Sequence, residues 1–289
     1  MSAIPLLGKP VAERILATVR SRAEAFQRRQ GRPATLTIVR VGEDADAAVY
    51  SRSLLRACRH AGLLGEDLRL PAATEERGAV AEIRRLGDSA AVDAIIIQTP
   101  LPAAFRRATL TDAIPPVKDV DGLSGENTGL LAQGRARHVP ATARALLLLA
   151  ETSGVTIAGA RTVVVGRSDV VGLPAALMLL QANATVTVCH RATADLAAET
   201  RRAELLVVAV GRPGLITGDM VAPGAVVLDA GTTMTTDGLR GDIDLASVTA
   251  VAAALTPVPG GVGPVTTAVL LQQVMAAAEE RAEGPGRDG

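Results

Sequence analysis

The stretch Arg161-Thr-Val-Val-Val-Gly-Arg-Ser-Asp-Val-Val-Gly-Leu-Pro174 joins a β-branched run to a glycine-containing turn, and a helix-forming segment follows it. Such an apolar run predicts a buried strand, and glycines at a strand-to-helix turn allow a pyrophosphate to bind at the helix N-terminus. The spacing departs from G-x-G-x-x-G, so an ordinary tight turn is the alternative interpretation. In both cases the stretch predicts one strand–turn–helix unit of an α/β fold.

Apolar runs separated by helix-length segments continue this pattern in the second half of the chain, at 185–188, 205–210 and 225–229. They predict a doubly wound, Rossmann-like half with a parallel sheet. The first half alternates in the same way, with strands expected at 35–41, 68–70 and 94–98 and helices at 44–60 and 79–86. A polar, Gly-rich stretch at 119–134 precedes an apolar helix at 141–151. We therefore expect two α/β domains, 1–138 and 139–265, with an interdomain cleft.

Composition limits the classes of function. The chain has 289 residues, 48% of them hydrophobic, and a formal net charge of zero. These values predict a soluble protein that acts on small molecules, with no nucleic-acid partner and no membrane association. No signal peptide or membrane span is evident, so a cytoplasmic location is expected. Cys58 and Cys189 lack metal-ligand spacing, so we expect no metal site and interpret both as small buried residues.

The strand at 185–188 is followed by Cys189-His190-Arg191, where NAD-binding folds usually place an acidic residue for the ribose 2′-hydroxyl. Arg191, together with Arg167 in the first glycine turn, could bind a 2′-phosphate through charge-assisted hydrogen bonds. This pattern favours NADP as the cofactor. Either arginine alone is more typical of a solvated surface charge.

The segment Thr256-Pro-Val-Pro-Gly-Gly-Val-Gly-Pro-Val-Thr266 consists mostly of Pro and Gly, a density that predicts a loop and excludes a helix or strand interior. Glycine lets a backbone approach a ligand closely, while the prolines fix the course of the loop. A rigid turn between elements is the simpler alternative.

Polar groups at strand ends in the first half could bind a flat heterocycle. The ring of Tyr50, the only tyrosine, could stack on it, while Gln98 and Asp121 hydrogen-bond its polar edge. Each has a plain alternative: Tyr50 as a packing residue, Gln98 as a strand-end cap, and Asp119 and Asp121 as turn residues.

Taken together, five motifs resemble the bifunctional methylenetetrahydrofolate dehydrogenase/methenyltetrahydrofolate cyclohydrolase family. They are Gln98-Thr-Pro-Leu-Pro102, Lys118-Asp-Val-Asp-Gly122, Gly166 to Pro174, Gly241-Asp-Ile-Asp244 and Thr256 to Thr266. The resemblance implies that 1–138 is a folate-binding catalytic domain completed by the C-terminal helix 266–289, whose polar end, 284–289, we expect to fray. It also implies an NADP domain at 139–265, a homodimer formed through that domain, and a cis peptide bond in the Pro-rich loop at Val258-Pro259.

The resemblance also implies roles for individual residues. Tyr50, Gln98 and Asp121 would hold the folate and serve the chemistry, and further substrate contacts would come from Gly260, Gly261, Pro264 and Thr266. NADP would be bound by Thr142, Gly166, Arg167, Ser168, Val171, Gly172, His190, Arg191, Val210, Gly211 and Thr232.

The expected folate face departs from the family at its catalytic lysine. The family uses a lysine four residues after the tyrosine for the proton transfers of hydrolysis, and this chain has Leu54 there. Basic residues are almost all arginine, with Lys9 and Lys118 the only lysines, but a drift towards arginine does not produce leucine. Arg52 and Arg56 lie roughly 200° and 240° round the helix from Tyr50, so neither replaces the lysine. Other departures are Ala47, Leu123, Ala141, Ala143 and the segment Asp229-Ala-Gly-Thr-Thr233.

Three hypotheses follow. The first is an NADP-dependent methylenetetrahydrofolate dehydrogenase with weak or lost cyclohydrolase activity, because hydride transfer needs no protein acid or base. The second is a related oxidoreductase with another substrate or role in a specialised pathway. The third is a non-catalytic folate- or NADP-binding protein.

Overall fold

The computed structural model describes residues 3–283, so the predicted frayed tail at 284–289 lies outside the described residues. The chain forms two compact units. The six-stranded unit contains residues up to Glu13 and Pro140–Thr266, and the three-stranded unit contains Arg14–Val139 and the chain from Thr267 onward. The sequence placed all of 1–138 in one domain, whereas the first thirteen residues group with the second half of the chain.

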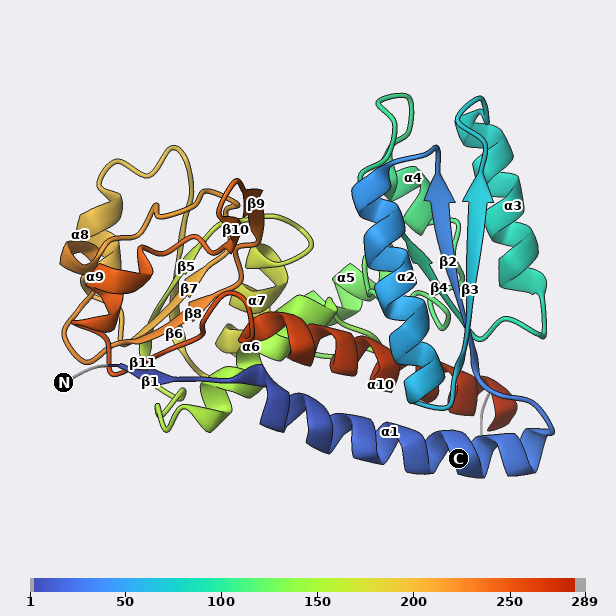
Figure 1. Cartoon of the computed structure of the whole chain (residues 1–289), viewed down its shortest axis with the longest axis horizontal. Helices are drawn as coiled ribbons and strands as arrows, with labels where there is room; N and C mark the ends of the chain where they lie inside the picture. The colour runs from blue at the N-terminus through green and yellow to red at the C-terminus, as the bar shows by residue number, and fades with distance from the viewer. Residues whose placement is uncertain (1–2, 284–289) are drawn as a thin grey trace. The chain divides into compact units, whose positions relative to one another are not determined.

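The three-stranded unit is a parallel sheet in the order β3-β2-β4 (Figure 1). β2 (Thr35–Val41) lies between β3 (Leu64–Leu70) and β4 (Ala94–Ile97), with Ile38 opposite Asp67 and Ile96. One face packs on α3 (Glu76–Asp88) and α4 (Arg107–Thr111) through buried residues such as Val39, Ile83 and Leu110. α2 (Ala45–His60) contacts β2 and β3, and α5 (Gly125–Ala132) lies within the polar, Gly-rich stretch at 119–134.

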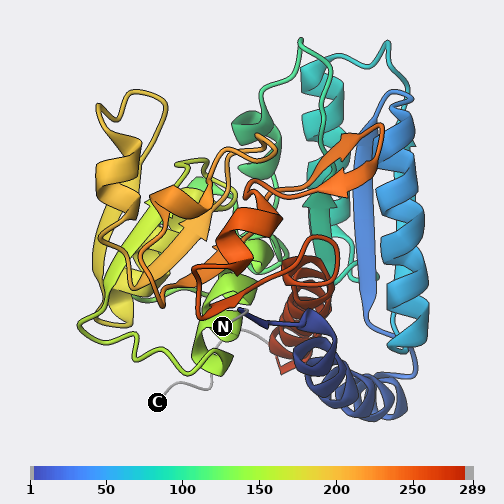
Figure 2. The same cartoon turned by 60° about the vertical axis from the view of Figure 1, so that its left-hand side comes forward.

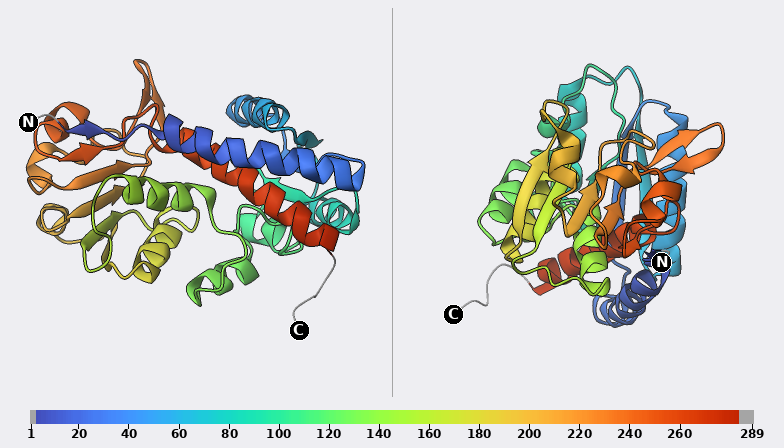
Figure 3. Two further views of the ribbon diagram at one scale, coloured as in Figure 1. Left: turned by 90° about the horizontal axis from the view of Figure 1, so that it is seen from below. Right: turned by 90° about the vertical axis from the view of Figure 1, so that its left-hand side faces the viewer.

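Two long helices complete this unit. α1 (Gly8–Gln30) and α10 (Val262–Glu283) run side by side in Figures 1 and 3, and Arg22 of α1 pairs with Glu279 of α10. α10 begins four residues earlier than the helix expected from residue 266, because Gly263 and Pro264 occupy its first turn. Proline is tolerated there, since the first helical N–H groups have no intrahelical acceptor.

The six-stranded unit is a wholly parallel sheet in the order β1-β11-β8-β7-β5-β6. The predicted strands are present as β5 (Arg161–Val165), β6 (Thr185–Cys189), β7 (Leu205–Val208) and β8 (Val226–Asp229). Two short strands that the sequence analysis did not identify, β1 (Ile4–Pro5) and β11 (Ala254–Leu255), pair with each other and extend the sheet beside β8. This pairing is what joins the N-terminus to the six-stranded unit.

Helices cover the sheet of this unit. α6 (Ala141–Thr152) packs on α7 (Gly172–Gln181), and α8 (Leu196–Thr200), the 3₁₀ turn η1 (Gly218–Met220) and α9 (Leu245–Thr249) contact one another. A hairpin of β9 (Thr233–Thr235) and β10 (Gly238–Arg240) projects from the sheet in Figure 2. The expected two-domain α/β architecture with a parallel, doubly wound half is therefore present.

Candidate functional site

Strand register brings Gln98 and Asp121 to one edge of the three-stranded sheet. Gln98 follows β4 directly, and an isolated parallel bridge pairs Ile95 with Asp119. The chain then turns, because Gly122 N donates to Asp119 O at 3.0 Å, and Asp121 lies in the turn that directly follows this bridge. Tyr50 lies on α2, the helix that follows the neighbouring strand β2, so all three come from the carboxyl end of the sheet.

The Tyr50 hydroxyl and the Asp121 carboxylate are close enough to affect each other. Burial, followed by the Asp121 charge, raises the pKa of Tyr50 to about 12, although 43% of the residue is exposed. Burial, followed by the charge of Asp119 and partly offset by Arg107, raises the pKa of Asp121 to about 7. Tyr50 is thus a hydrogen-bond donor at neutral pH, while Asp121 is divided between its two protonation states.

Lys118 and Asp119, three and two residues before Asp121, have structural roles. The Lys118 amine donates to the carbonyls of Leu86, Gly87 and Ser89 at the end of α3, at 3.3, 2.6 and 2.7 Å. Asp119 accepts hydrogen bonds from Ser124 N and Asn127 Nδ2.

By contrast, Asp121 and the Tyr50 hydroxyl have no hydrogen-bond partner within residues 3–283. Gln98 donates from Nε2 to Thr99 O, which leaves its Oε1 as an acceptor. The three groups expected to bind folate are therefore available to a ligand.

The residue one turn after Tyr50 is part of the packed interior. Leu54 is only 2% exposed and lies on the buried face of α2 with Ala47, Ser51 and Cys58. A leucine side chain there can exchange no proton. Neither lysine of the chain supplies a proton-carrying group at this position. Lys118 caps α3, and Lys9 is an exposed residue of α1 that pairs with Glu13.

The glycine turn after β5 is as tight as its sequence indicated. Gly166 has φ +119°, and a Cβ on it would lie 2.2 Å from the carbonyl oxygen of Ala209. A Cβ on Gly172 would lie 2.1 Å from the carbonyl oxygen of Gly166. The Ser168 hydroxyl accepts from Val171 N, and no acidic residue occupies the first turn of α7. This compact turn at an uncapped helix N-terminus suits the pyrophosphate of a dinucleotide.

The other residues predicted to bind the cofactor follow neighbouring strands at the same carboxyl edge. His190 and Arg191 follow β6, Val210 and Gly211 follow β7, and Thr232 follows β8. Thr142 differs, since it lies in the first turn of α6. Arg167 and Arg191 are exposed and have no ion-pair partner within the described chain. Both can therefore take up an anionic group.

Asp242 holds part of this edge in place, a role that the sequence analysis did not assign. Its carboxylate accepts from the backbone N–H groups of Val210, Gly211 and Arg212, at 2.6, 3.0 and 2.6 Å. Buried Asp229 in turn accepts from Asp242 N at 3.0 Å. Aspartate within a Gly-Asp-Ile-Asp motif was the available signal, because such a motif often fixes backbone amides.

The Pro- and Gly-rich loop lies at the carboxyl end of β11. The Val258–Pro259 peptide bond is cis, as the resemblance implied. Gly8 N donates to Gly260 O at 2.9 Å, and a Cβ on Gly8 would lie 1.9 Å from Gly261 O. These contacts with the N-terminal segment hold the Pro- and Gly-rich loop in place. Pro264 and Thr266 lie in the first turns of α10, where the Thr266 hydroxyl donates to Val262 O.

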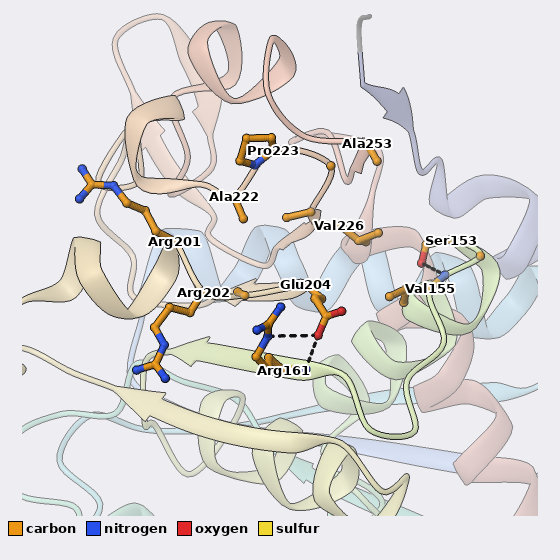
Figure 4. A pocket seen from close by; sticks show the side chains of 14 residues that line it. Ser153, Val155, Arg161, Arg201, Arg202, Glu204, Ala222, Pro223, Val226 and Ala253 are labelled. Atoms are coloured by element: carbon orange, nitrogen blue, oxygen red, sulfur yellow. Dashed lines mark hydrogen bonds and ion pairs between the residues drawn. The ribbon is translucent and has the colours of Figure 1, made fainter.

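A cavity of about 670 Å³ lies at the opposite, amino edge of the six-stranded sheet (Figure 4). Arg161 and Glu204 pair at its wall, and Arg201 donates from Nε to Asp219 O. Figure 4 shows the Arg201 and Arg202 side chains directed away from Arg161. The cavity contains none of the predicted site residues.

Residues 3–283 contain no helix that is both long and apolar enough to cross a membrane. Nor do His, Cys, Asp and Glu side chains gather there in groups of three that could hold a metal ion.

Both units match models of one protein family. Residues 6–121 match the catalytic domain of tetrahydrofolate dehydrogenase/cyclohydrolase, and residues 140–282 match its NAD(P)-binding domain. The chain belongs to the tetrahydrofolate dehydrogenase/cyclohydrolase family. The predicted family and the prediction of a nicotinamide dinucleotide site in the second half are thus confirmed.

Individual members of the tetrahydrofolate dehydrogenase/cyclohydrolase family are similar over their full length. The bifunctional protein FolD of Bordetella avium is 46% identical over 280 residues, which cover 96% of this chain and 98% of that protein. The bifunctional enzyme FolD of Campylobacter jejuni has a TM-score of 0.93 at 33% identity, covering 97% of this chain and all of the other. A Trypanosoma brucei FolD, solved with NADP and an inhibitor, has a TM-score of 0.92 at 35% identity, with coverage of 98% and 99%.

Proposed function

We propose that the chain is an NADP-dependent 5,10-methylenetetrahydrofolate dehydrogenase whose methenyltetrahydrofolate cyclohydrolase activity is weak or lost. Family membership supports the dehydrogenase half of the proposal. The observation that carries the second half is Leu54, which is buried one turn after Tyr50 in a chain whose two lysines lie elsewhere.

The three-stranded unit would bind the folate. The exposed face of the Tyr50 ring would stack on the pterin, and Gln98 Oε1 and the Asp121 carboxylate would accept hydrogen bonds from its polar edge. These contacts orient the methylene carbon without forming a covalent bond to the protein.

The six-stranded unit would bind NADP at the carboxyl edge of its sheet. The glycine turn at Gly166 and Gly172 would hold the pyrophosphate, and Arg167 and Arg191 would bind the 2′-phosphate. Bound NADP supplies a hydride acceptor. The preference for NADP over NAD rests on the two unpaired arginines and on the lack of an acidic residue after β6.

The two reactions make different demands on the protein. Oxidation removes a hydride from the methylene carbon and leaves a resonance-stabilised methenyl cation, and no proton moves in that step. Hydrolysis adds water to this cation and must remove a proton before the ring opens to the 10-formyl product, which requires a group that accepts and returns protons. Leu54 exchanges no proton, and Tyr50, with its pKa near 12, is a poor proton acceptor. The Asp121 carboxyl, whose pKa is raised to about 7, could exchange a proton, but in this proposal it holds the polar edge of the folate.

We also propose that the protein is a homodimer formed through the six-stranded unit. β6 is an edge strand that pairs only with β5, and Val188 on it is 37% exposed. Leu173 and Leu180 of α7 are also exposed large apolar residues of this unit. An unprotected edge strand beside exposed leucines favours self-association. Light scattering of the wild type and of Val188→Lys tests the proposed dimer. We expect the wild type to be a dimer and Val188→Lys to be a monomer. A monomeric wild type would contradict the proposal.

The primary test follows both reactions by the absorbance of the methenyl product. With 5,10-methylenetetrahydrofolate and NADP, methenyltetrahydrofolate should form. It should then decay about as slowly as it does in buffer without protein. No NADP-dependent oxidation despite binding of both ligands would instead indicate a non-catalytic binding protein. The free Tyr50, Gln98 and Asp121 groups argue against that alternative.

A further inference from the structure

The side chain of Gln273 on α10 connects two backbone segments of the three-stranded unit. Its Nε2 donates to Val120 O at 2.7 Å and to Val139 O at 2.9 Å, and its Oε1 accepts from Val139 N at 2.9 Å. A side-chain amide has two N–H donors and a carbonyl acceptor, so both donors and the acceptor are in use. No other uncharged side chain except asparagine offers this combination, and asparagine is one methylene shorter.

One of these bonds fixes the peptide unit directly before Asp121. The Val120 carbonyl belongs to the same rigid plane as the Asp121 N–H, so anchoring that oxygen sets the direction in which the Asp121 side chain leaves the backbone. Gly122, on the other side, packs so closely that a Cβ on it would lie 2.6 Å from His138 O. The backbone around Asp121 is therefore held by α10 and by the segment at His138–Val139.

The Asp121 carboxylate has no such anchor of its own. Asp119, two residues earlier, is held by Ser124 N at 2.8 Å and by Asn127 Nδ2 at 3.0 Å. The Asp121 side chain makes no hydrogen bond within the described chain, and the charge of Asp119 repels it. Its orientation towards a ligand thus depends on the backbone that carries it.

We propose that Gln273 is the positioning residue that orients Asp121 towards the bound folate. The inference rests on the proposed function, since it assigns Asp121 to substrate binding. It places a determinant of folate affinity on the C-terminal helix, at a residue outside the predicted contacts to folate and NADP.

The variant Gln273→Glu tests this role with almost no change of shape. It keeps the acceptor for Val139 N but turns an oxygen towards two carbonyls, so the Val120 peptide loses its anchor. We expect kcat/KM for 5,10-methylenetetrahydrofolate to fall about 10- to 100-fold and the Kd for tetrahydrofolate, measured by calorimetry, to rise about tenfold. The KM for NADP should change less than about twofold. Gln273→Asn, which keeps both donors, should show a smaller loss in the same direction.

The matched control lies fewer than two turns further along α10. Glu279→Gln removes an ion pair with Arg22 and should lower the unfolding midpoint as Gln273→Glu does, with folate kinetics unchanged. A double-mutant cycle with Asp121→Asn tests whether Gln273 acts through Asp121. If it does, Gln273→Glu should change kcat/KM and the folate Kd only slightly in the Asp121→Asn background. Additive losses, or an unchanged folate Kd in Gln273→Glu, overturn the inference. If Asp121→Asn alone leaves folate binding and turnover unchanged, the proposed role of Asp121 fails instead.

Discussion

Leu54 lies one helical turn after Tyr50 on α2, and the two side chains differ in environment. Leu54 is 2% exposed, whereas Tyr50 is 43% exposed. Residues four apart share one face of a helix, so a proton-carrying side chain at position 54 would meet a ligand stacked on Tyr50. In the proposed site, leucine therefore occupies the position of the lysine that the family resemblance implies for hydrolysis.

Leu54→Lys should give the protein measurable hydrolysis of methenyltetrahydrofolate above the buffer rate. The new amine can exchange protons, and Tyr50, Gln98 and Asp121 already have free polar groups. Lysine at a buried position should also lower the free energy of unfolding by roughly 2 kcal/mol or more. The decay of methenyl absorbance measures the gain, and Leu54→Met is the control. Equal rates for the lysine and methionine variants would mean that Leu54 is not the cause of the missing activity.

Lys118→Met should destabilise the protein without changing its proton chemistry. The amine holds three carbonyls at the end of α3, and its loss should cost roughly 2–4 kcal/mol. Urea denaturation measures this loss, and the methenyl decay rate should equal that of the wild type. A variant that keeps its stability but changes the decay rate would show that Lys118 takes part in the chemistry.

Asp121→Asn should stabilise the protein more at pH 8 than at pH 5. Because the pKa of Asp121 is raised to about 7 in the folded state, the folded chain binds more protons than the unfolded chain between about pH 4 and 7. Stability is therefore lost as pH rises through this window, and asparagine avoids the loss. The gain has an upper limit of roughly 4 kcal/mol, which partial exposure of the side chain reduces.

Urea midpoints at the two pH values measure the effect of Asp121→Asn. Glu126→Gln, at an exposed carboxylate on α5, is the control and should show no change between pH 5 and 8. A gain from Asp121→Asn that is equal at both values contradicts the raised pKa.

Arg191→Ala should weaken binding of NADP about tenfold or more and affect NAD less than about twofold. Only NADP carries the 2′-phosphate that the guanidinium would bind. Fluorescence titration of both dinucleotides measures the difference. Arg161→Ala, at the amino end of β5, is a control expected to change neither affinity. A similar loss for NADP and NAD with Arg191→Ala rules out the 2′-phosphate contact.

Strands with continuous apolar patterns were predictable from the sequence. β2 and β5 lie at their expected residues because both are buried and rich in β-branched side chains. β3 was expected only at 68–70, since Leu64-Gly-Glu-Asp67 resembles a turn. It is an edge strand whose polar residues bond to β2, through Arg40–Asp67 and Thr37–Glu66. This stabilisation comes from the neighbouring strand, so the sequence of residues 64–67 does not itself indicate a strand.

The 23-residue helix α1 was missed for a related reason. Most of its residues are polar, and its buried side chains form a narrow stripe that includes Val19, Ala23 and Phe26. The spacing of four and three residues was the available signal. For the site, the sequence predicted which residue types follow the strands. It did not predict which aspartates lack a hydrogen-bond partner in the protein. Only the hydrogen bonds distinguish the anchored Asp119 from the unpartnered Asp121.

We propose that this family member oxidises methylenetetrahydrofolate and hydrolyses the product weakly or not at all. The most direct measurement is the decay of methenyltetrahydrofolate at neutral pH, with and without purified wild-type protein whose dehydrogenase activity has been recorded in the same preparation. We expect NADP-dependent formation of the methenyl product and a decay rate close to that in buffer. A decay strongly accelerated in proportion to protein concentration would contradict this proposal.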